Sequence, residues 1–169
     1  MVLTVNNIDR QAQVVLTTEQ LVEHSNLSKS QLMIWMGQQL ETESPLYNMV
    51  LCFYLQEIID TECFQQAFST LISSSDALRT IIETVNGIPQ QRVLDQLDYQ
   101  IEIVDLSNES VPEQALADWI AIHNKQQFNL SQCSFESTLL YTGNGQTVWY
   151  FNQHHLTTDA WSISLIYKN

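Results

Sequence analysis

Short apolar segments typical of strands alternate along this chain with amphipathic segments typical of helices. The clearest helix begins after Asp60, where apolar residues recur at positions 64, 67, 68, 71 and 72, the spacing that places them on one helix face. The segment 47–55 just before it is short and nearly all apolar, which predicts a buried strand. This alternation predicts an α/β sandwich, a mixed sheet with helices mainly on one face.

Other local signals complete this order of elements. Ser28 and Gln31 form a capping box, which predicts a helix through Leu40. Asn86-Gly87 and Gly143-Asn144-Gly145 predict the turns of two hairpins. We expect the remaining elements at 78–85, 88–94, 99–104, 135–141 and 147–152 for strands, and from Ser110, Pro112 and Glu113 onward and at 163–169 for helices.

Charge and cysteine content exclude several functions. The formal net charge is −13, so we expect neither nucleic acid nor an anionic membrane surface as a partner. The 3 cysteines include no CxxC pair, which argues against structural zinc and disulfides and favours a reducing, cytoplasmic location. No segment has the pattern of a secretory signal or the length of a membrane span.

The residues that could carry chemistry lie at 153–162, where His154 and His155 leave a strand and Asp159 follows a short loop. Adjacent side chains of a strand point to opposite faces, so the two histidines cannot both bind one metal ion. We expect no metal site here. One histidine should face a cleft and could accept a proton, while the other faces the core. The alternative is a histidine pair at a turn with no function.

These residues resemble a known motif. His154-His155-x-x-x-Asp159 is similar to the HHxxxDG motif of the condensation domains of nonribosomal peptide synthetases, within the chloramphenicol-acetyltransferase-like superfamily. Three further segments agree in order and spacing, so that the resemblance covers roughly residues 25–169. They are Ser28-x-Ser30-Gln31-x-x-x-Trp35 with the Pro45-x-Tyr47-Asn48 strand entry (SxAQxRLW), 75–80 (HExLRT) and 128–131 (FDLS).

The resemblance implies a fold and partners. Family domains have two similar α/β lobes in a V, with a tunnel that receives the phosphopantetheine arms of acyl or peptidyl carrier domains. The chain resembles the N-terminal lobe, so we interpret 1–25 as an irregular arm and 26–169 as this lobe, truncated after the motif. We therefore expect the missing C-terminal lobe and adjacent synthetase domains as partners, and expect the 169 residues to be inactive alone.

The resemblance also assigns roles within acyl transfer, in which an amine or hydroxyl attacks a carrier-bound thioester and forms an amide or ester. It implies His155 as the catalytic group, with His154 structural and no cofactor bound directly. We expect Asp159 to hold the loop, with Arg79 as the remaining candidate partner. Trp161 and Ser162 fall near a helix start, where free N–H groups could face the reacting carbonyl.

Several positions depart from the family pattern. Ala160 replaces the motif glycine, and Ser74 and Ser75 stand where the family has Arg and His. These changes motivate an alternative, a catalytically silent docking or scaffold module. A free acyltransferase that uses coenzyme A is disfavoured by the opening helix. His24 and His123 have no ligand spacing and are interpreted as surface or helix residues.

Overall fold

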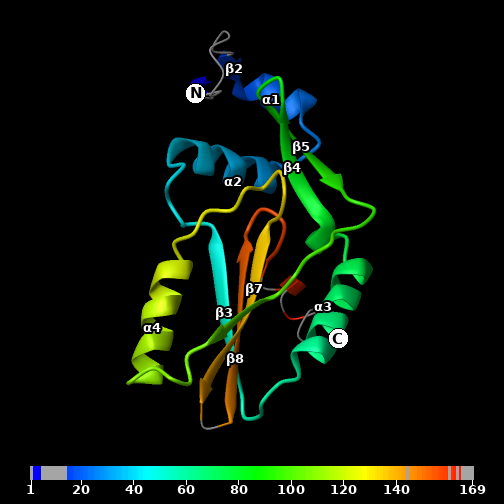
Figure 1. The fold of residues 1–169 in the computed structure, drawn as a ribbon. Helices are drawn as coiled ribbons and strands as arrows, with labels where there is room; N and C mark the ends of the chain where they lie inside the picture. The colour runs from blue at the N-terminus through cyan, green and yellow to red at the C-terminus, as the bar shows by residue number, and fades with distance from the viewer. Residues whose placement is uncertain (1, 5–14, 144, 160, 163, 165–169) are drawn as a thin grey trace.

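The computed structural model describes residues 2–4, 15–143, 145–159, 161–162 and 164. Its centre is a mixed sheet of four strands in the order β3-β8-β7-β6 (Figure 1). The neighbours β3–β8 and β8–β7 are antiparallel, whereas β6 and β7 run parallel. The strands are β3 (Asn48–Leu55), β6 (Glu102–Asp105), β7 (Phe135–Gly143) and β8 (Gln146–His154).

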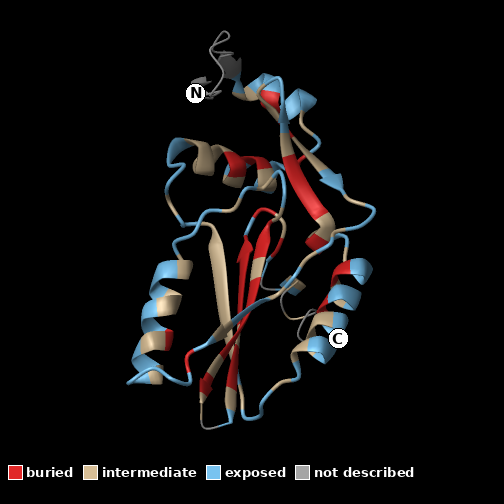
Figure 2. Ribbon diagram, in the orientation of Figure 1, coloured by how far each residue is buried: buried red, intermediate tan, exposed pale blue. Residues whose placement is uncertain are grey.

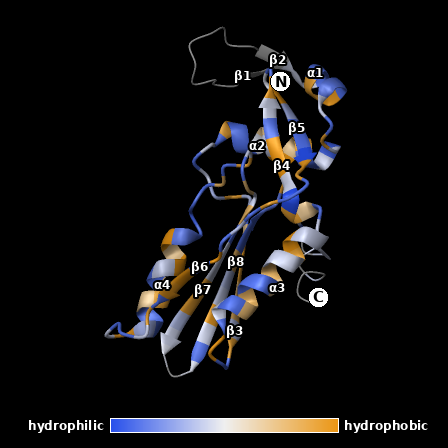
Figure 3. Ribbon diagram, turned by 45° about the vertical axis from the view of Figure 1, so that its right-hand side comes forward, coloured by the Kyte–Doolittle hydropathy of each residue, from blue (hydrophilic) through white to orange (hydrophobic). Residues whose placement is uncertain are grey.

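Two helices cover opposite faces of this sheet. Phe68 and Ile72 of α3 (Thr61–Ser74) pack on Phe151, while α4 (Pro112–His123) packs on Tyr150. Because residues 150 and 151 are neighbours on β8, their side chains point to opposite faces. Figures 1 and 3 accordingly show α3 and α4 on either side of the strands. The mixed α/β sheet is confirmed, but the expected placement of the helices mainly on one face is wrong.

Burial along β8 explains why both faces need a helix. Its residues are buried on both sides over most of the strand, and Val148, Tyr150 and Phe151 are at most 1% exposed (Figure 2). Apolar surface on both faces of a strand must be covered by packed elements. The edge strand β3 is only half-buried, so the prediction of a buried strand at 47–55 is right in position and wrong in burial.

A second group of elements packs at the end of the sheet where β8 finishes. It contains α1 (Thr18–His24), α2 (Lys29–Leu40), the hairpin of β4 (Thr80–Val85) and β5 (Ile88–Val93), and the pair β1 (Val2–Thr4) and β2 (Val15–Thr17). The short helix η1 (Ala77–Arg79) instead packs through Leu78 with α3. Leu32 and Trp35 of α2 pack with Leu21, Ile82 and Leu156. This cluster fixes the loop that follows β8.

The predicted helix caps and the first hairpin turn are confirmed. Ser28 and Gln31 form both hydrogen bonds of the capping box, and Asp60 accepts the Cys63 N–H at 2.8 Å. Asn86 and Gly87 have φ of 53° and 82°, the left-handed conformation that a tight hairpin requires.

Other boundaries differ from the expectation. Residues 15–24 form β2 and α1 rather than an irregular arm, because Thr17 and Gln20 make a second capping box. The first residue of α4 is Pro112, and its N-cap is Val111 rather than Ser110. Most of the helix expected at 163–169 lies outside the described residues.

Gly37 on α2 lies against the Tyr47 side chain, so its lack of a side chain matters for space rather than for backbone conformation. A Cβ at this position would lie 2.0 Å from the Tyr47 hydroxyl oxygen. Tyr47 immediately precedes β3, so glycine lets α2 approach the start of the sheet closely.

Candidate functional site

The backbone of the histidine pair is held from both sides. The His154 N–H donates to the Ser134 carbonyl at 2.8 Å, and the His155 N–H donates to the Tyr47 carbonyl at 2.8 Å. Ser134 precedes β7 and Tyr47 precedes β3, the two strands that flank β8. Consecutive amides thus point to opposite neighbours, the geometry that also sends consecutive side chains to opposite faces.

The His154 ring lies inside the protein, where it is only 3% exposed. Its Nδ1 accepts the Leu156 N–H at 3.1 Å, and its Nε2 lies 3.5 Å from Gln38 Oε1. Burial, and to a smaller extent the neighbouring His155, lower the pKa of His154 from 6.5 to about 4. The ring is therefore neutral near pH 7 and holds the turn after β8 in shape.

The His155 ring is exposed and oriented by the backbone. Its Nδ1 lies 2.7 Å from the Thr158 carbonyl oxygen. A carbonyl can only accept a hydrogen bond, so Nδ1 carries the proton of the neutral ring. Nε2 then keeps its lone pair, which is the form of imidazole that can accept a proton from a nucleophile.

Asp159 is also exposed, but its carboxylate is engaged in the short helical segment that follows. Oδ1 accepts the Ser162 N–H at 2.8 Å and the Ser162 hydroxyl at 2.7 Å. The backbone hydrogen bond from Ser162 is the main reason why the pKa of Asp159 is lowered, and the Trp161 N–H contributes as well. The expectation that these N–H groups are free to face a reacting carbonyl is therefore wrong.

The expected pairing of Arg79 with Asp159 is also wrong. Arg79 forms its ion pair with Asp76, between Nη2 and Oδ1 at 2.6 Å. Its Nε donates to the Ile72 carbonyl at 3.2 Å, and its Nη1 donates to the Leu94 carbonyl. Arg79 thus ties the end of α3 to the residue after β5, and its role is in the packing of the lobe.

Comparison with known proteins identifies a family for this fold and these residues. The model of the condensation domain matches residues 22–169. The chain belongs to the condensation-domain family.

Relatives of this condensation domain are much longer synthetases. Over 143 residues, 84% of the chain, it is 29% identical to malpinin synthetase of Mortierella alpina, of which it covers 2%. It is 27% identical to the dimodular nonribosomal peptide synthase of Bacillus subtilis, matching 83% of the chain and 6% of that protein.

Solved structures show the same lobe. The starter condensation domain of rhizomide synthetase, in complex with C8-CoA, superposes with a TM-score of 0.79 at 28% identity, over 85% of this chain and 33% of that one. The first condensation domain of the calcium-dependent antibiotic synthetase shares the fold, with a TM-score of 0.76 at 21% identity. The chain therefore spans about a third of the solved condensation domains.

The opening helix of the condensation domain holds the loop of the histidine motif. Gln31 of the capping box donates through Nε2 to the Leu156 carbonyl at 3.1 Å, and the Leu156 side chain is 2% exposed. The Thr157 hydroxyl donates to the Ser134 hydroxyl at 2.9 Å. These contacts fix the turn that carries His155, so the motif of the opening helix has a positional role in the site.

Two contacts in this lobe could not be predicted from the sequence. The Thr158 carbonyl that orients His155 is a backbone group, and backbone groups have no residue signature. His123 is not an isolated histidine, because its Nδ1 lies 2.9 Å from Glu136 Oε1. The pairing with Glu136 joins α4 to β7 through tertiary packing, so no local sequence signal marks it.

The helices of the structure bear on whether the chain could cross a membrane. Within the described ranges, none of them combines the length and the apolar content that crossing a bilayer demands.

Proposed function

We propose that this chain supplies the catalytic histidine of a condensation domain that joins a carrier-bound acyl or peptidyl thioester to an amine or hydroxyl acceptor. The single observation that carries the proposal is the His155 ring, exposed and with its Nδ1 proton donated to the Thr158 carbonyl. The family membership supports the same reaction class.

The proposed reaction needs no covalent intermediate with the protein. The acceptor nitrogen or oxygen forms a bond to the thioester carbonyl carbon, the carbon–sulfur bond breaks, and the carrier thiol leaves. His155 Nε2 takes the proton of the acceptor and passes it to the leaving thiolate. Because a thioester is already activated, the larger contribution is alignment of the two tethered substrates.

Partners follow from this proposal. The substrates would arrive on phosphopantetheine arms of carrier domains, with no cofactor bound directly by this lobe. The His155 ring is open to solvent, so a second lobe would be needed to enclose the reacting groups and exclude water. The relatives are synthetases of much greater length, so we propose that adjacent synthetase domains supply the carriers.

A second candidate function, a catalytically silent docking or scaffold module, has one observation in its favour. The Asp159 carboxylate caps the helical segment at Ser162, while Arg79 is paired elsewhere, so the motif acid has no arginine bridge among the described residues. Such a module would keep the fold and the partner surfaces without turnover.

The test is His155→Ala in the full-length protein, supplied with loaded donor and acceptor carriers. We expect product formation, followed by mass spectrometry of the carriers, to fall by about 100-fold or more. The melting temperature should stay unchanged because the ring is exposed and packs little. Retained turnover in the variant would exclude His155 as the essential group, and an inactive wild-type protein would favour the silent module.

A further inference from the structure

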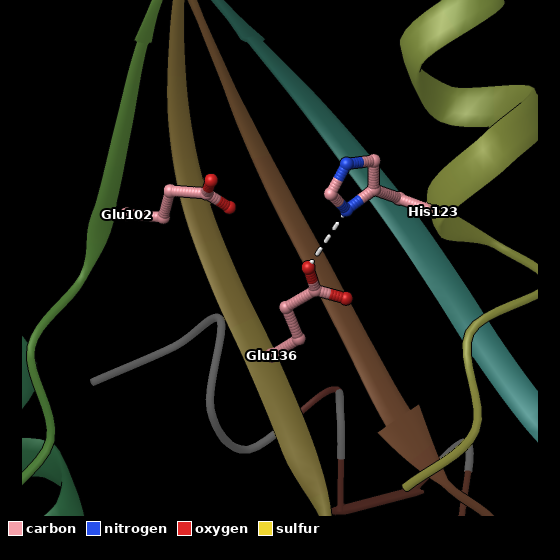
Figure 4. Close-up of side chains that lie close together, drawn as sticks. All are labelled: Glu102, His123 and Glu136. Atoms are coloured by element: carbon pink, nitrogen blue, oxygen red, sulfur yellow. Dashed lines mark hydrogen bonds and ion pairs between the residues drawn. The ribbon is translucent and has the colours of Figure 1, made fainter.

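A second group of titratable side chains lies on the sheet face that α4 covers, away from the histidine pair. Figure 4 shows Glu102 of β6, Glu136 of β7 and His123 at the end of α4 pointing toward one another. One ligand atom from each residue lies within 4.8 Å of the other two. His123 Nδ1 and Glu136 Oε1 are 2.9 Å apart. Three elements that are distant in sequence thus bring an imidazole and two carboxylates together.

Buried polar atoms without partners adjoin this group. Glu136 Oε2 is buried and makes no hydrogen bond, and the same holds for Oδ1 and Nδ2 of Asn152. Asn152 is 0% exposed and pairs directly with Glu136 across β7 and β8, so both side chains stand on the same face. Buried polar atoms are normally satisfied, so the two oxygens, Glu136 Oε2 and Asn152 Oδ1, have lone pairs free for a ligand.

The local charge favours a cation. Burial raises the pKa of Glu136, the nearby His123 lowers it, and the charge of Glu102 raises it again. In the described part of the chain, neither glutamate forms an ion pair with a lysine or arginine. A cation would therefore neutralise two carboxylates that are close together, of which Glu136 is partly buried and Glu102 is exposed.

We propose that Glu102, His123 and Glu136 bind a first-row divalent metal ion of the zinc type. An imidazole ligand beside carboxylates suits zinc better than magnesium or calcium, which prefer oxygen ligands alone. The metal would replace the proton between His123 Nδ1 and Glu136 Oε1, next to Asn152, the cross-strand partner of Glu136. The His123 ring stacks on Trp119 at 3.6 Å, so it is held in place for binding.

The role of this metal would be structural. It would join the end of α4 to strands β6 and β7, and the site lies on the α4 face rather than at the exposed His155. A ligand that binds only the folded state raises the melting temperature. At a free zinc concentration 100 times the Kd, we expect a rise of about 5 °C.

The experiment titrates Zn²⁺ into the metal-stripped full-length protein by isothermal calorimetry, with Mg²⁺ as the comparison ion. We expect one equivalent of zinc at this site and no saturable magnesium binding there. Glu136→Gln and His123→Gln should each weaken zinc binding by at least about 10-fold. The matched control is His24→Gln, because His24 and Glu23 form an exposed pair, with Nε2 and Oε2 3.9 Å apart, and should leave the binding unchanged.

A second measurement protects the test against variants that fold poorly. Anomalous scattering at the zinc edge, from crystals of the wild-type protein grown with zinc, should place an ion between Glu136 and His123. Absence of saturable zinc binding would overturn the proposal, as would equal affinity in the wild-type and Glu136→Gln proteins. An ion located only at other residues would also overturn it.

Discussion

The end of β8 and the turn just after it differ in almost every property, although they are adjacent in sequence. His154 is 3% exposed and packs against Tyr47 and Phe128, whereas His155 is exposed and makes its ring hydrogen bond to a backbone carbonyl. One residue of strand geometry separates a buried ring that holds the turn from an exposed ring that we propose as the catalytic group. Two residues of the same type, adjacent in sequence, can therefore have opposite environments because strand geometry sends their side chains to opposite faces.

The largest expected effect on stability comes from the buried member of the pair. His154→Ala removes a packed ring and leaves the Leu156 N–H without its acceptor. We expect a loss of about 3 kcal/mol in the free energy of unfolding, measured by urea denaturation. His155→Ala is the matched control and should change it by less than about 0.5 kcal/mol. Equal losses in the two variants would remove the contrast between these histidines.

The pH dependence of stability should report on the buried His154. The pKa of His154 is lowered from 6.5 to about 4 in the folded protein, so the unfolded chain binds more protons between these values. The stabilisation is fully present above pH 6.5 and is lost as the pH falls toward 4.

The size of this pH effect is about 3 kcal/mol, since one pKa unit corresponds to 1.36 kcal/mol. It is measured as the difference between wild-type and His154→Gln unfolding curves from pH 7 to 4, in which the contributions of the carboxylates cancel. A wild-type curve that runs parallel to that of the variant would show that His154 is not responsible.

The smallest effect is expected in the turn, at Asp159. Asp159→Ala removes the acceptor of the Ser162 N–H and hydroxyl, while Asp159→Asn keeps a side-chain oxygen that can cap. We expect Ala to lower the melting temperature less than His154→Ala does, and Asn to lower it hardly at all. Should Asn instead be as damaging as Ala, the charge of Asp159 would matter more than its role as a cap.

Much of the fold could be predicted because its signals are local. Ser28 and Asp60 mark two helix starts, Asn86-Gly87 marks a hairpin, and strand alternation separates His154 from His155. Each of these signals is read from a few adjacent residues. The family resemblance rests on the same segments and is confirmed.

The remaining differences arise from contacts between distant segments. The strand expected at 99–104 begins at Glu102, because the Gln65 side chain from α3 bonds the Tyr99 carbonyl at 2.8 Å and the Ile101 N–H at 2.9 Å. The face covered by α4 depends on the crossover between the parallel strands β6 and β7. The partner of Arg79 is likewise settled only by tertiary packing.

The close approach of Gly37 to Tyr47 has a consequence for how such lobes diverge. Because a Cβ at position 37 would meet the phenol oxygen at 2.0 Å, a side chain there demands that the Tyr47 ring moves aside, that residue 47 is smaller or that α2 shifts. The Tyr47 carbonyl also accepts the hydrogen bond of the His155 N–H. Positions 37 and 47 should therefore vary together across related sequences, and a larger residue at 37 alone should displace the Tyr47 side chain beside the backbone of His155.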